Sequence, residues 1–300
     1  MTILMTNSMQ LKSLAGKIAV VAGGTRGAGR AIAVSLGEAG ATVYVTGRSV
    51  RGSLSDIGRS ETIDETAEII QARGGTAFPI RVDHTVESEV VALFERVKQE
   101  QGRLDILVND IWGGESLVDW TKPFWEHSLA KGLLVQERAV RTHMVTSYYA
   151  AQLMVENKQG LILEITDGVS YDYRGNLYYS LAKISNIHLA QAMAEDLRPY
   201  GVTSLSLTPG FLRSEEMLEH FGVTEANWQE GAKKDPNFIA SETPYYIGRA
   251  VVALASDPNV IEKTGGAYST WGLSEVYDFT DLDGTRPHWG RHYAEHVAKA

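Results

Sequence analysis

The sequence contains no cysteine among its 300 residues. Disulfide frameworks, thiol nucleophiles and cysteine-ligated metal sites are therefore excluded, and the composition suits a reducing compartment, for which we predict the cytoplasm. No apolar run approaches the roughly 20 residues of a membrane-spanning helix, so no membrane partner is expected. Basic residues are in deficit, with 28 lysines and arginines against 37 acids and a formal charge of −9. Nucleic-acid binding needs a basic surface, so no nucleic-acid partner is predicted.

Short apolar runs alternate regularly with longer amphipathic stretches. The apolar runs predict strands at 18–22, 42–46, 76–82, 104–109, 160–166, 203–208 and 267–270. The amphipathic stretches predict helices at 27–39, 61–73, 87–101, 136–155, 176–200 and 244–256, the last with Thr243 as a hydroxyl cap and Pro244 in its first turn. Such alternation is typical of an α/β protein with a doubly wound, mostly parallel sheet covered by helices on both faces.

No break in composition divides the chain, so residues 1–300 are predicted to form a single domain. Residues 1–13 lack the features of a secretory signal and are predicted to be a flexible tail. Residues 211–241 form a long stretch with one short helix predicted at 214–221. Because long loops in compact domains are often lids, this stretch is predicted to cover a substrate. Residues 271–300 form a C-terminal extension after the last strand.

The first predicted strand opens into a glycine-rich turn, Gly23-x-x-x-Gly27-x-Gly29. Glycine permits the tight bend and lets the backbone approach a pyrophosphate closely. The helix that follows offers free N–H groups and the positive end of its dipole to phosphates. The turn therefore predicts a dinucleotide cofactor.

The residues after the second strand predict which dinucleotide binds. An NAD site would place an acid there to bind the ribose hydroxyls, but the sequence reads Thr46-Gly47-Arg48. Arg48, joined by Arg26 from the glycine turn, suits a 2′-phosphate through forked hydrogen bonds, so NADP(H) is predicted. Asp83, at the end of the third strand, either accepts from the adenine amino group or caps the following helix.

Tyr179 and Lys183 lie four residues apart in a predicted helix and therefore share one face. A tyrosine has a pKa near 10, and a neighbouring ammonium group, together with the charge of a nicotinamide, favours the phenolate. Tyr179 can then exchange a proton with a substrate oxygen while a hydride passes to or from the nicotinamide. The pair predicts an oxidoreductase acting on a small carbonyl or alcohol.

Between Lys17 and Thr270 the chain resembles the short-chain dehydrogenase/reductase family, and the stretch 273–284 is similar to that of its dehydrogenase/reductase member 1 subgroup. The resemblance implies a seven-stranded Rossmann sheet, NAD(P)(H) binding, and homodimers or homotetramers. It implies that Val108 and Asn109 line the cofactor and that Pro209 and Gly210 lie beside the nicotinamide. The full predicted cofactor set is Gly23, Thr25, Arg26, Gly27, Ala28, Gly29, Arg48, Ser49, Asp83, His84, Asn109, Tyr179, Lys183, Pro209 and Gly210.

The sequence departs from the family pattern at the catalytic serine, which normally stands about a dozen residues before the tyrosine. Thr166 has the expected spacing and a hydroxyl, Asp167 takes the place if the loop is one residue shorter, and Ser170 is a third candidate. A carboxylate there would repel a developing alkoxide unless protonated. The family's helix asparagine, which supports a proton-relay water, aligns near Ala139, and Trp112 stands where a glycine is expected.

Two further groups of side chains stand out in the sequence. Loop aromatics are predicted to form a substrate wall: Trp112, Trp120, Trp125, Tyr171 and Tyr173. Three histidines recur every fourth residue from His288 to His296, but a proline and a glycine weaken that helix, and no metal site is predicted. The missing serine and asparagine motivate an alternative function, a non-enzymatic NADP-binding redox sensor or scaffold.

Overall fold

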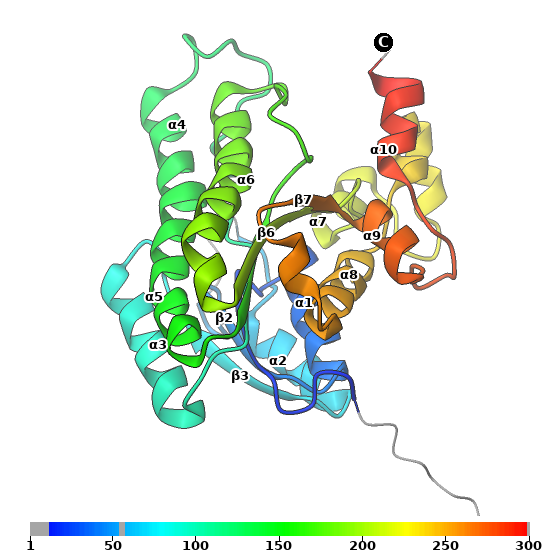
Figure 1. Cartoon of the computed structure of the whole chain (residues 1–300). Helices are drawn as coiled ribbons and strands as arrows, with labels where there is room; N and C mark the ends of the chain where they lie inside the picture. The colour runs from blue at the N-terminus through cyan, green and yellow to red at the C-terminus, as the bar shows by residue number, and fades with distance from the viewer. Residues whose placement is uncertain (1–11, 54–57, 299–300) are drawn as a thin grey trace, which may run out of the picture.

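The computed structural model describes residues 12–53 and 58–298 (Figure 1). Residues 1–11 of the predicted tail and 299–300 of the predicted extension lie outside the described residues. The two described residues of the tail make contacts with the rest of the chain. Lys12 Nζ donates to the Gly74 carbonyl at 3.0 Å, and Ser256 Oγ donates to Ser13 Oγ at 3.1 Å.

Seven strands form one sheet in the order β3-β2-β1-β4-β5-β6-β7, and every neighbouring pair is parallel. The strands are β1 (Ile18–Ala22), β2 (Thr42–Gly47), β3 (Thr76–Arg81), β4 (Ile106–Asn109), β5 (Gly160–Ile165), β6 (Val202–Thr208) and β7 (Ala267–Ser269). The predicted doubly wound Rossmann sheet is therefore confirmed. The strand order reverses between β1 and β4, and in such sheets ligands bind in the crevice at the carboxyl ends of the strands.

Helices cover both faces of the sheet (Figure 1). They are α1 (Gly27–Glu38), α2 (Ile63–Ala72), α3 (Glu87–Gln101), α4 (Leu129–Gln136), α5 (Thr142–Asn157), α6 (Leu177–Leu197), α7 (Glu215–Phe221), α8 (Pro244–Ser256), α9 (Thr270–Tyr277) and α10 (Trp289–His292). A π-helical turn, Glu137–Arg141, joins α4 to α5.

The core has two layers because successive strand side chains point to opposite faces. In β1, Ala19 and Val21 pack with α1, α2 and α8, whereas Ile18 and Val20 pack with α3, α5 and the end of α6. Strands buried on both faces read as continuous apolar runs, which is why the sequence located them well.

Three local predictions differ from the structure. The helix predicted from residue 136 already begins at Leu129, after Ser128, and Gly132 within it leaves room for the Tyr178 ring, which would lie 2.3 Å from a Cβ. Thr270 starts α9 instead of ending β7. Thr243 does not cap α8 with its hydroxyl, because that group donates to Asp281 Oδ1 at 2.5 Å.

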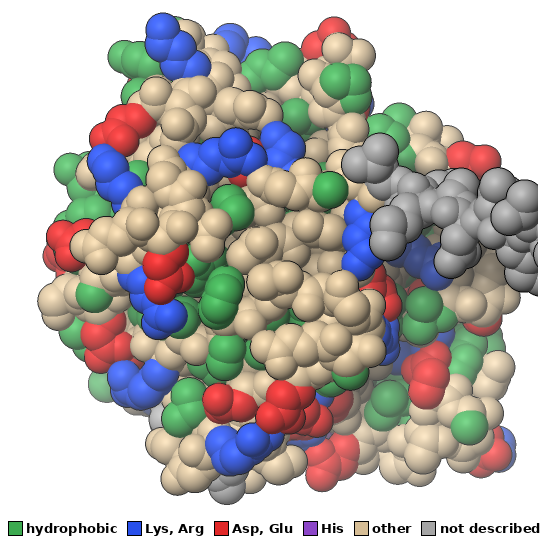
Figure 2. Space-filling view, turned by 90° about the horizontal axis from the view of Figure 1, so that it is seen from below, with side chains coloured by type: hydrophobic (Ala, Val, Ile, Leu, Met, Phe, Trp, Pro, Cys, Tyr) green, Lys and Arg blue, Asp and Glu red, His purple; other side chains and the backbone are tan. Residues whose placement is uncertain are grey.

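The surface mixes both signs of charge. On the face shown in Figure 2, lysine and arginine side chains lie among aspartate and glutamate side chains. Across residues 12–53 and 58–298, every helix is too short or too polar to cross a lipid bilayer.

Candidate active site

A cavity of about 300 Å³ lies at the carboxyl ends of β1 to β4. Its wall is built by the segments that follow these strands, so residues far apart in the sequence meet there. Ten residues of the predicted cofactor set line it: Gly23, Thr25, Arg26, Gly27, Ala28, Arg48, Ser49, Asp83, His84 and Lys183.

The glycine turn makes the close contacts that its sequence predicts. Gly23 has a φ of +92°, and a Cβ there would lie 2.3 Å from the Asp110 carbonyl oxygen. Gly29 does not line the cavity; a Cβ at this position would lie 2.3 Å from the Gly23 carbonyl, so Gly29 lets α1 pack against the turn. Above Gly27, the nearest atom to an added Cβ is 3.8 Å away, on Ser214. The open side of the turn therefore faces the segment that begins α7.

A carboxylate of the chain itself already occupies one N–H of this turn. Glu215, the first residue of α7, accepts from the Gly27 N–H through Oε2 at 2.8 Å, and its Oε1 lies 3.6 Å from Arg30 Nη1. A helix N-terminus attracts anions. Glu215 thus stands where a phosphate oxygen would be stabilised.

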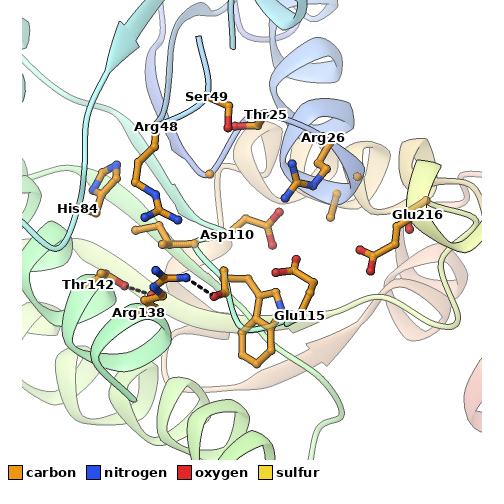
Figure 3. Close-up of a pocket in the computed structure, with 18 of the residues that line it drawn as sticks. Thr25, Arg26, Arg48, Ser49, His84, Asp110, Glu115, Arg138, Thr142 and Glu216 are labelled. Carbon is orange, nitrogen blue, oxygen red and sulfur yellow. Dashed lines mark hydrogen bonds between the residues drawn. The ribbon is translucent and has the colours of Figure 1, made fainter. Parts of the chain in front are cut away.

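Two arginines bring positive charge to the cavity. Arg48 follows β2 and Arg26 precedes α1, and both guanidinium groups reach toward the cavity with Asp110 between them (Figure 3). Burial raises the pKa of Asp110 to about 7, although Lys183, His143 and the Gly29 N–H act to lower it. Asp110 can therefore exchange a proton near neutral pH.

Asp83 and His84 are held by local partners. Asp83 Oδ1 accepts from the Thr85 N–H at 3.0 Å and from its hydroxyl at 2.6 Å. These hydrogen bonds form the turn before α3. The N-cap residue of α3 is Val86, not Asp83. The His84 ring lies between the hydroxyls of Thr46 and Thr146, each 2.8 Å away, and burial lowers its pKa to about 3.

Val108 and Asn109 are predicted to line the cofactor, but their side chains point away from the cavity. Val108 is part of the apolar core. Asn109 is fully buried, and its Nδ2 donates to Glu164 Oε1 at 2.9 Å and to Ser147 Oγ at 2.8 Å. The residues that follow β4, from Asp110 to Gly113, line the cavity in their place.

A second cavity of about 420 Å³ adjoins the first, because Ala28, Asp110, Lys183 and Leu212 line both. The remaining predicted residues lie in this second cavity: Thr166, Asp167, Tyr179, Pro209 and Gly210. The structure therefore brings together Tyr179, Lys183 and the Pro209–Gly210 loop, beside the glycine turn.

Asp167 contacts the phenol. The Tyr179 hydroxyl donates to Asp167 Oδ2 at 2.9 Å. Thr166 was the first candidate for the serine position, but its hydroxyl donates to the Lys183 carbonyl at 2.6 Å, and that of Ser170 donates to Asp172 Oδ2 at 2.6 Å. Of the three candidates, Asp167 is therefore the one whose side chain is hydrogen-bonded to Tyr179.

The surroundings of Tyr179 and Lys183 do not favour the phenolate that the sequence predicts. Burial and the Asp167 carboxylate raise the pKa of Tyr179 well above its usual range. Burial lowers the pKa of Lys183, while Asp167, Asp110 and Glu115 act to raise it. Lys183 Nζ lies over the Trp112 ring, 4.5 Å from its centroid. At neutral pH the Tyr179 phenol therefore keeps its proton.

Part of the predicted aromatic wall is present. Trp112 and Trp120 pack edge-on against Tyr179, with ring centroids 5.4 and 5.0 Å away. Trp125, Tyr171 and Tyr173 are exposed and line neither cavity.

The sequence missed the far wall of the second cavity. Phe211 and Trp289 line it, with ring centroids 5.7 Å apart. Trp289 belongs to the C-terminal extension and packs against Gly210, whose added Cβ would lie 2.7 Å from Trp289 Cβ. No local pattern in the sequence links residue 289 to residue 210. Asp110, by contrast, directly follows the predicted cofactor residue Asn109, and Glu215 lies in the short helix predicted at 214–221.

The histidines of the extension serve other purposes. His292 Nε2 lies 3.0 Å from Asn237 Oδ1, and the His292 and His296 rings are 4.7 Å apart. Within residues 12–53 and 58–298, no group of three or more histidines or acids is placed to hold a metal ion.

Comparison with known proteins finds relatives along most of the chain. The family model described as short chain dehydrogenase matches residues 17–223. The chain is 37% identical over 273 residues to human "Dehydrogenase/reductase SDR family member 1", covering 90% of this chain and 84% of the relative.

Solved structures resemble it as well. One is a 7α-hydroxysteroid dehydrogenase complexed with NADH and 7-oxo glycochenodeoxycholic acid (TM-score 0.69, 25% identity, 91% of this chain and 96% of that one). Another is a metagenomic short-chain oxidoreductase in complex with NADP (TM-score 0.63, 23% identity, 82% of this chain and 93% of that one).

Proposed function

Because the chain belongs to the short-chain dehydrogenase/reductase family and is thus an oxidoreductase of CH–OH or C=O groups, we propose that it uses NADP(H) with Tyr179 as acid/base. The observation that carries the proposal is the shared wall of the two cavities. Lys183 lines both, so the phenol of Tyr179 and the glycine turn open into one continuous site.

The residues present fit a dinucleotide. The glycine turn leaves a cradle that side chains would fill, and α1 directs its N-terminus into it. In this proposal the turn and Ser214 hold the pyrophosphate, Arg26 and Arg48 hold the 2′-phosphate, and Pro209 and Gly210 lie beside the nicotinamide. When bound, the nicotinamide supplies or accepts the hydride.

The side chains of this protein then handle the proton. Tyr179 donates a proton to the carbonyl oxygen in reduction and accepts one from the alcohol in oxidation. Lys183 contributes positive charge beside the reacting oxygen, which offsets part of the effect of Asp167 on the phenol. Trp112 and Trp120 hold the ring of Tyr179 and exclude water from one side of it.

The test is a titration with NADPH followed by a panel of aldehydes, ketones and secondary alcohols, with coenzyme oxidation or reduction read by absorbance. We expect NADPH binding and turnover of at least one compound. Tight binding with no turnover on any compound would instead support the non-enzymatic alternative raised by the sequence.

Replacing Arg48 by alanine should weaken NADPH far more than NADH. A hydrogen bond to a charged group contributes about 1.5–3 kcal/mol, which corresponds to roughly 10- to 150-fold in Kd. The measurement is the Kd of each coenzyme by fluorescence. Arg51→Ala is the matched control, because Arg51 is exposed and pairs with Glu68. Equal losses for NADPH and NADH in Arg48→Ala would refute the preference for NADP(H).

Replacing Glu215 by glutamine should tighten NADPH binding by up to about tenfold, or 1.4 kcal/mol. The glutamine removes the negative charge that competes with phosphate at the Gly27 N–H. Glu219→Gln is the control, since Glu219 lies one turn further along α7 and pairs with Arg59. If Glu215→Gln binds NADPH no better than Glu219→Gln, Glu215 does not compete with the coenzyme.

We further propose that residues 1–300 form one NADP-binding domain in which 211–241 is the lid and 271–300 closes the substrate cavity. Met217, Asp235 and Asn237 of the lid and Trp289 of the extension line the second cavity, which supports this division. The aromatic lining suits a hydrophobic, medium-sized carbonyl or alcohol.

We infer that the chain forms homodimers or homotetramers through α4, α5 and α6, which pack side by side (Figure 1). Large apolar side chains repeat every four residues on their outer surface: Leu129, Leu133, Met144, Tyr148, Leu177 and Leu181, all exposed. Exposed apolar patches mark contact surfaces. Light scattering should give two or four times the chain mass of 32.9 kDa, and a monomer would contradict the inference.

We also propose a cytoplasmic location, which the cysteine-free composition supports and which cell fractionation tests.

A further inference from the structure

Asp167 connects the phenol of Tyr179 to bulk water. Its Oδ2 accepts from the Tyr179 hydroxyl at 2.9 Å, yet 46% of its side chain is exposed. The half-buried Tyr179 ring packs edge-on against Trp112 and Trp120. Asp167 therefore offers the reacting hydroxyl a hydrogen-bonded route to the solvent.

The loop that carries Asp167 is fastened in this orientation. Arg174 Nε donates to the Asp167 carbonyl at 2.6 Å and lies 3.9 Å from Oδ2. The other guanidinium nitrogens of Arg174 donate to the carbonyls of Ser170 and Asp172, each at 2.6 Å. Because Arg174 holds three carbonyls of the loop by hydrogen bonds, the Asp167 carboxylate stays directed toward Tyr179.

Two positions that carry the proton or a hydroxyl in the family pattern are not available here. The position of the family's relay asparagine is Ala139, which is buried among Val135, Tyr178 and Ala182 and carries no polar side-chain atom. The Thr166 hydroxyl is committed to the Lys183 carbonyl. Asp167 is thus the group placed to exchange a proton with Tyr179.

We propose that Asp167 is the base that takes the phenolic proton of Tyr179 during alcohol oxidation and passes it to water. The proposal rests on the proposed function and deepens it. A carboxylate is acceptor-only when ionised, so it suits this role better than the serine it replaces.

The step balances as follows. The alcohol C–H bond breaks, and its hydrogen and electron pair pass to NADP⁺, which is reduced as the alcohol becomes a carbonyl. The alcohol O–H proton moves to the Tyr179 oxygen while the Tyr179 proton moves to Asp167 Oδ2. Asp167 then releases this proton to water and is again a carboxylate. Reduction runs the same transfers backwards.

The arrangement also affects the rate at neutral pH, and it does so in both directions because oxidation and reduction share one transition state. An ionised carboxylate beside the reacting oxygen disfavours a developing alkoxide, and it stabilises the proton removed from an alcohol. Other charges face the pair from each packed element: Lys183 from α6, Arg174 from the preceding loop, Asp110 after β4, and Glu115 from the loop beyond. We infer that the protein oxidises alcohols at neutral pH better than a serine at residue 167 would allow.

The first test needs no substrate or coenzyme. The protein carries isotope-labelled tyrosine, and the NMR signal absent from Tyr179→Phe identifies Tyr179. Asp167→Asn and Asp167→Ser should each move the titration of this signal to lower pH by about one unit or more. Asp172→Asn, an exposed acid on the same loop, is the control. An unchanged titration in both Asp167 variants would overturn the proposal.

The second test is the pH profile of kcat/KM for the best secondary alcohol of the panel, with NADP⁺. In the wild type the rate should hold down to neutral pH. In Asp167→Asn and Asp167→Ser it should fall about tenfold per pH unit below the phenol pKa, and Asp167→Glu should restore part of the neutral-pH rate.

Different outcomes would contradict the role of Asp167 and the proposed function. If Tyr179→Phe is inactive but Asp167→Asn keeps the wild-type profile, the role of Asp167 is wrong and the proposed function stands. If Tyr179→Phe keeps full turnover, the proposed function itself fails, and the role of Asp167 fails with it.

Discussion

Replacing Tyr179 by phenylalanine should lower kcat by about 10²- to 10⁴-fold, which is the usual contribution of a positioned acid/base. The variant keeps the ring that packs between Trp112 and Trp120 and loses only the hydroxyl that donates to Asp167. The Kd for NADPH should change little, because phenylalanine keeps the ring that lines the second cavity and only the hydroxyl is lost. Single-turnover kinetics with NADPH and a carbonyl substrate give both quantities.

Tyr178→Phe is the matched control for this experiment. Tyr178 is the neighbouring residue on α6, but its ring is buried against Gly132 and lies 5.0 Å from His127. We expect this variant to retain most of its activity. If Tyr179→Phe kept more than about a tenth of the wild-type kcat, acid/base catalysis by Tyr179 would have to be abandoned.

Removal of His143 should cost about 3–5 kcal/mol in the free energy of unfolding, because it leaves a cavity and removes the closest hydrogen-bond partner of a buried acid. His143 Nδ1 lies 2.5 Å from Glu164 Oε2, and both side chains are fully buried. The opposite ring nitrogen donates to the Ile111 carbonyl at 2.9 Å. The pair therefore ties β5 to the loop after β4 that lines the cavity.

Urea unfolding of His143→Ala, compared with His188→Ala on the exposed side of α6, measures this contribution. The alanine leaves Glu164 with the donors Asn109 and Ser147 only, so a buried carboxylate loses its closest partner. A loss below about 1 kcal/mol, typical of an average substitution, would mean that the pair does not stabilise the fold.

The catalytic loop shows the limit of reasoning from spacing. Thr166 and Asp167 are adjacent, and counting back from Tyr179 could not decide between them. The choice depends on the hydrogen bonds that each side chain makes after the chain leaves β5, to the Lys183 carbonyl for Thr166 and to the Tyr179 hydroxyl for Asp167. Asn109, the last residue of β4, likewise turns its side chain toward Glu164.

The C-terminal extension illustrates a second limit. Trp289 reaches Gly210 and Phe211 across the sheet edge, and no periodic pattern encodes such a contact. Likewise, Glu215 is an ordinary first-turn acid of a short helix until the tertiary fold places it on the Gly27 N–H.

The sequence by itself determined the parallel sheet, the glycine turn and the Tyr179–Lys183 face, because each depends on spacing within one strand, turn or helix. Apolar runs, glycine positions and a four-residue interval are local properties, and local geometry fixes their consequences. Only the tertiary structure decided which oxygen contacts Tyr179, what closes the second cavity and which carboxylate meets the cofactor turn. These contacts join segments distant in the chain, and they depend on strand register and packing, which no single segment encodes.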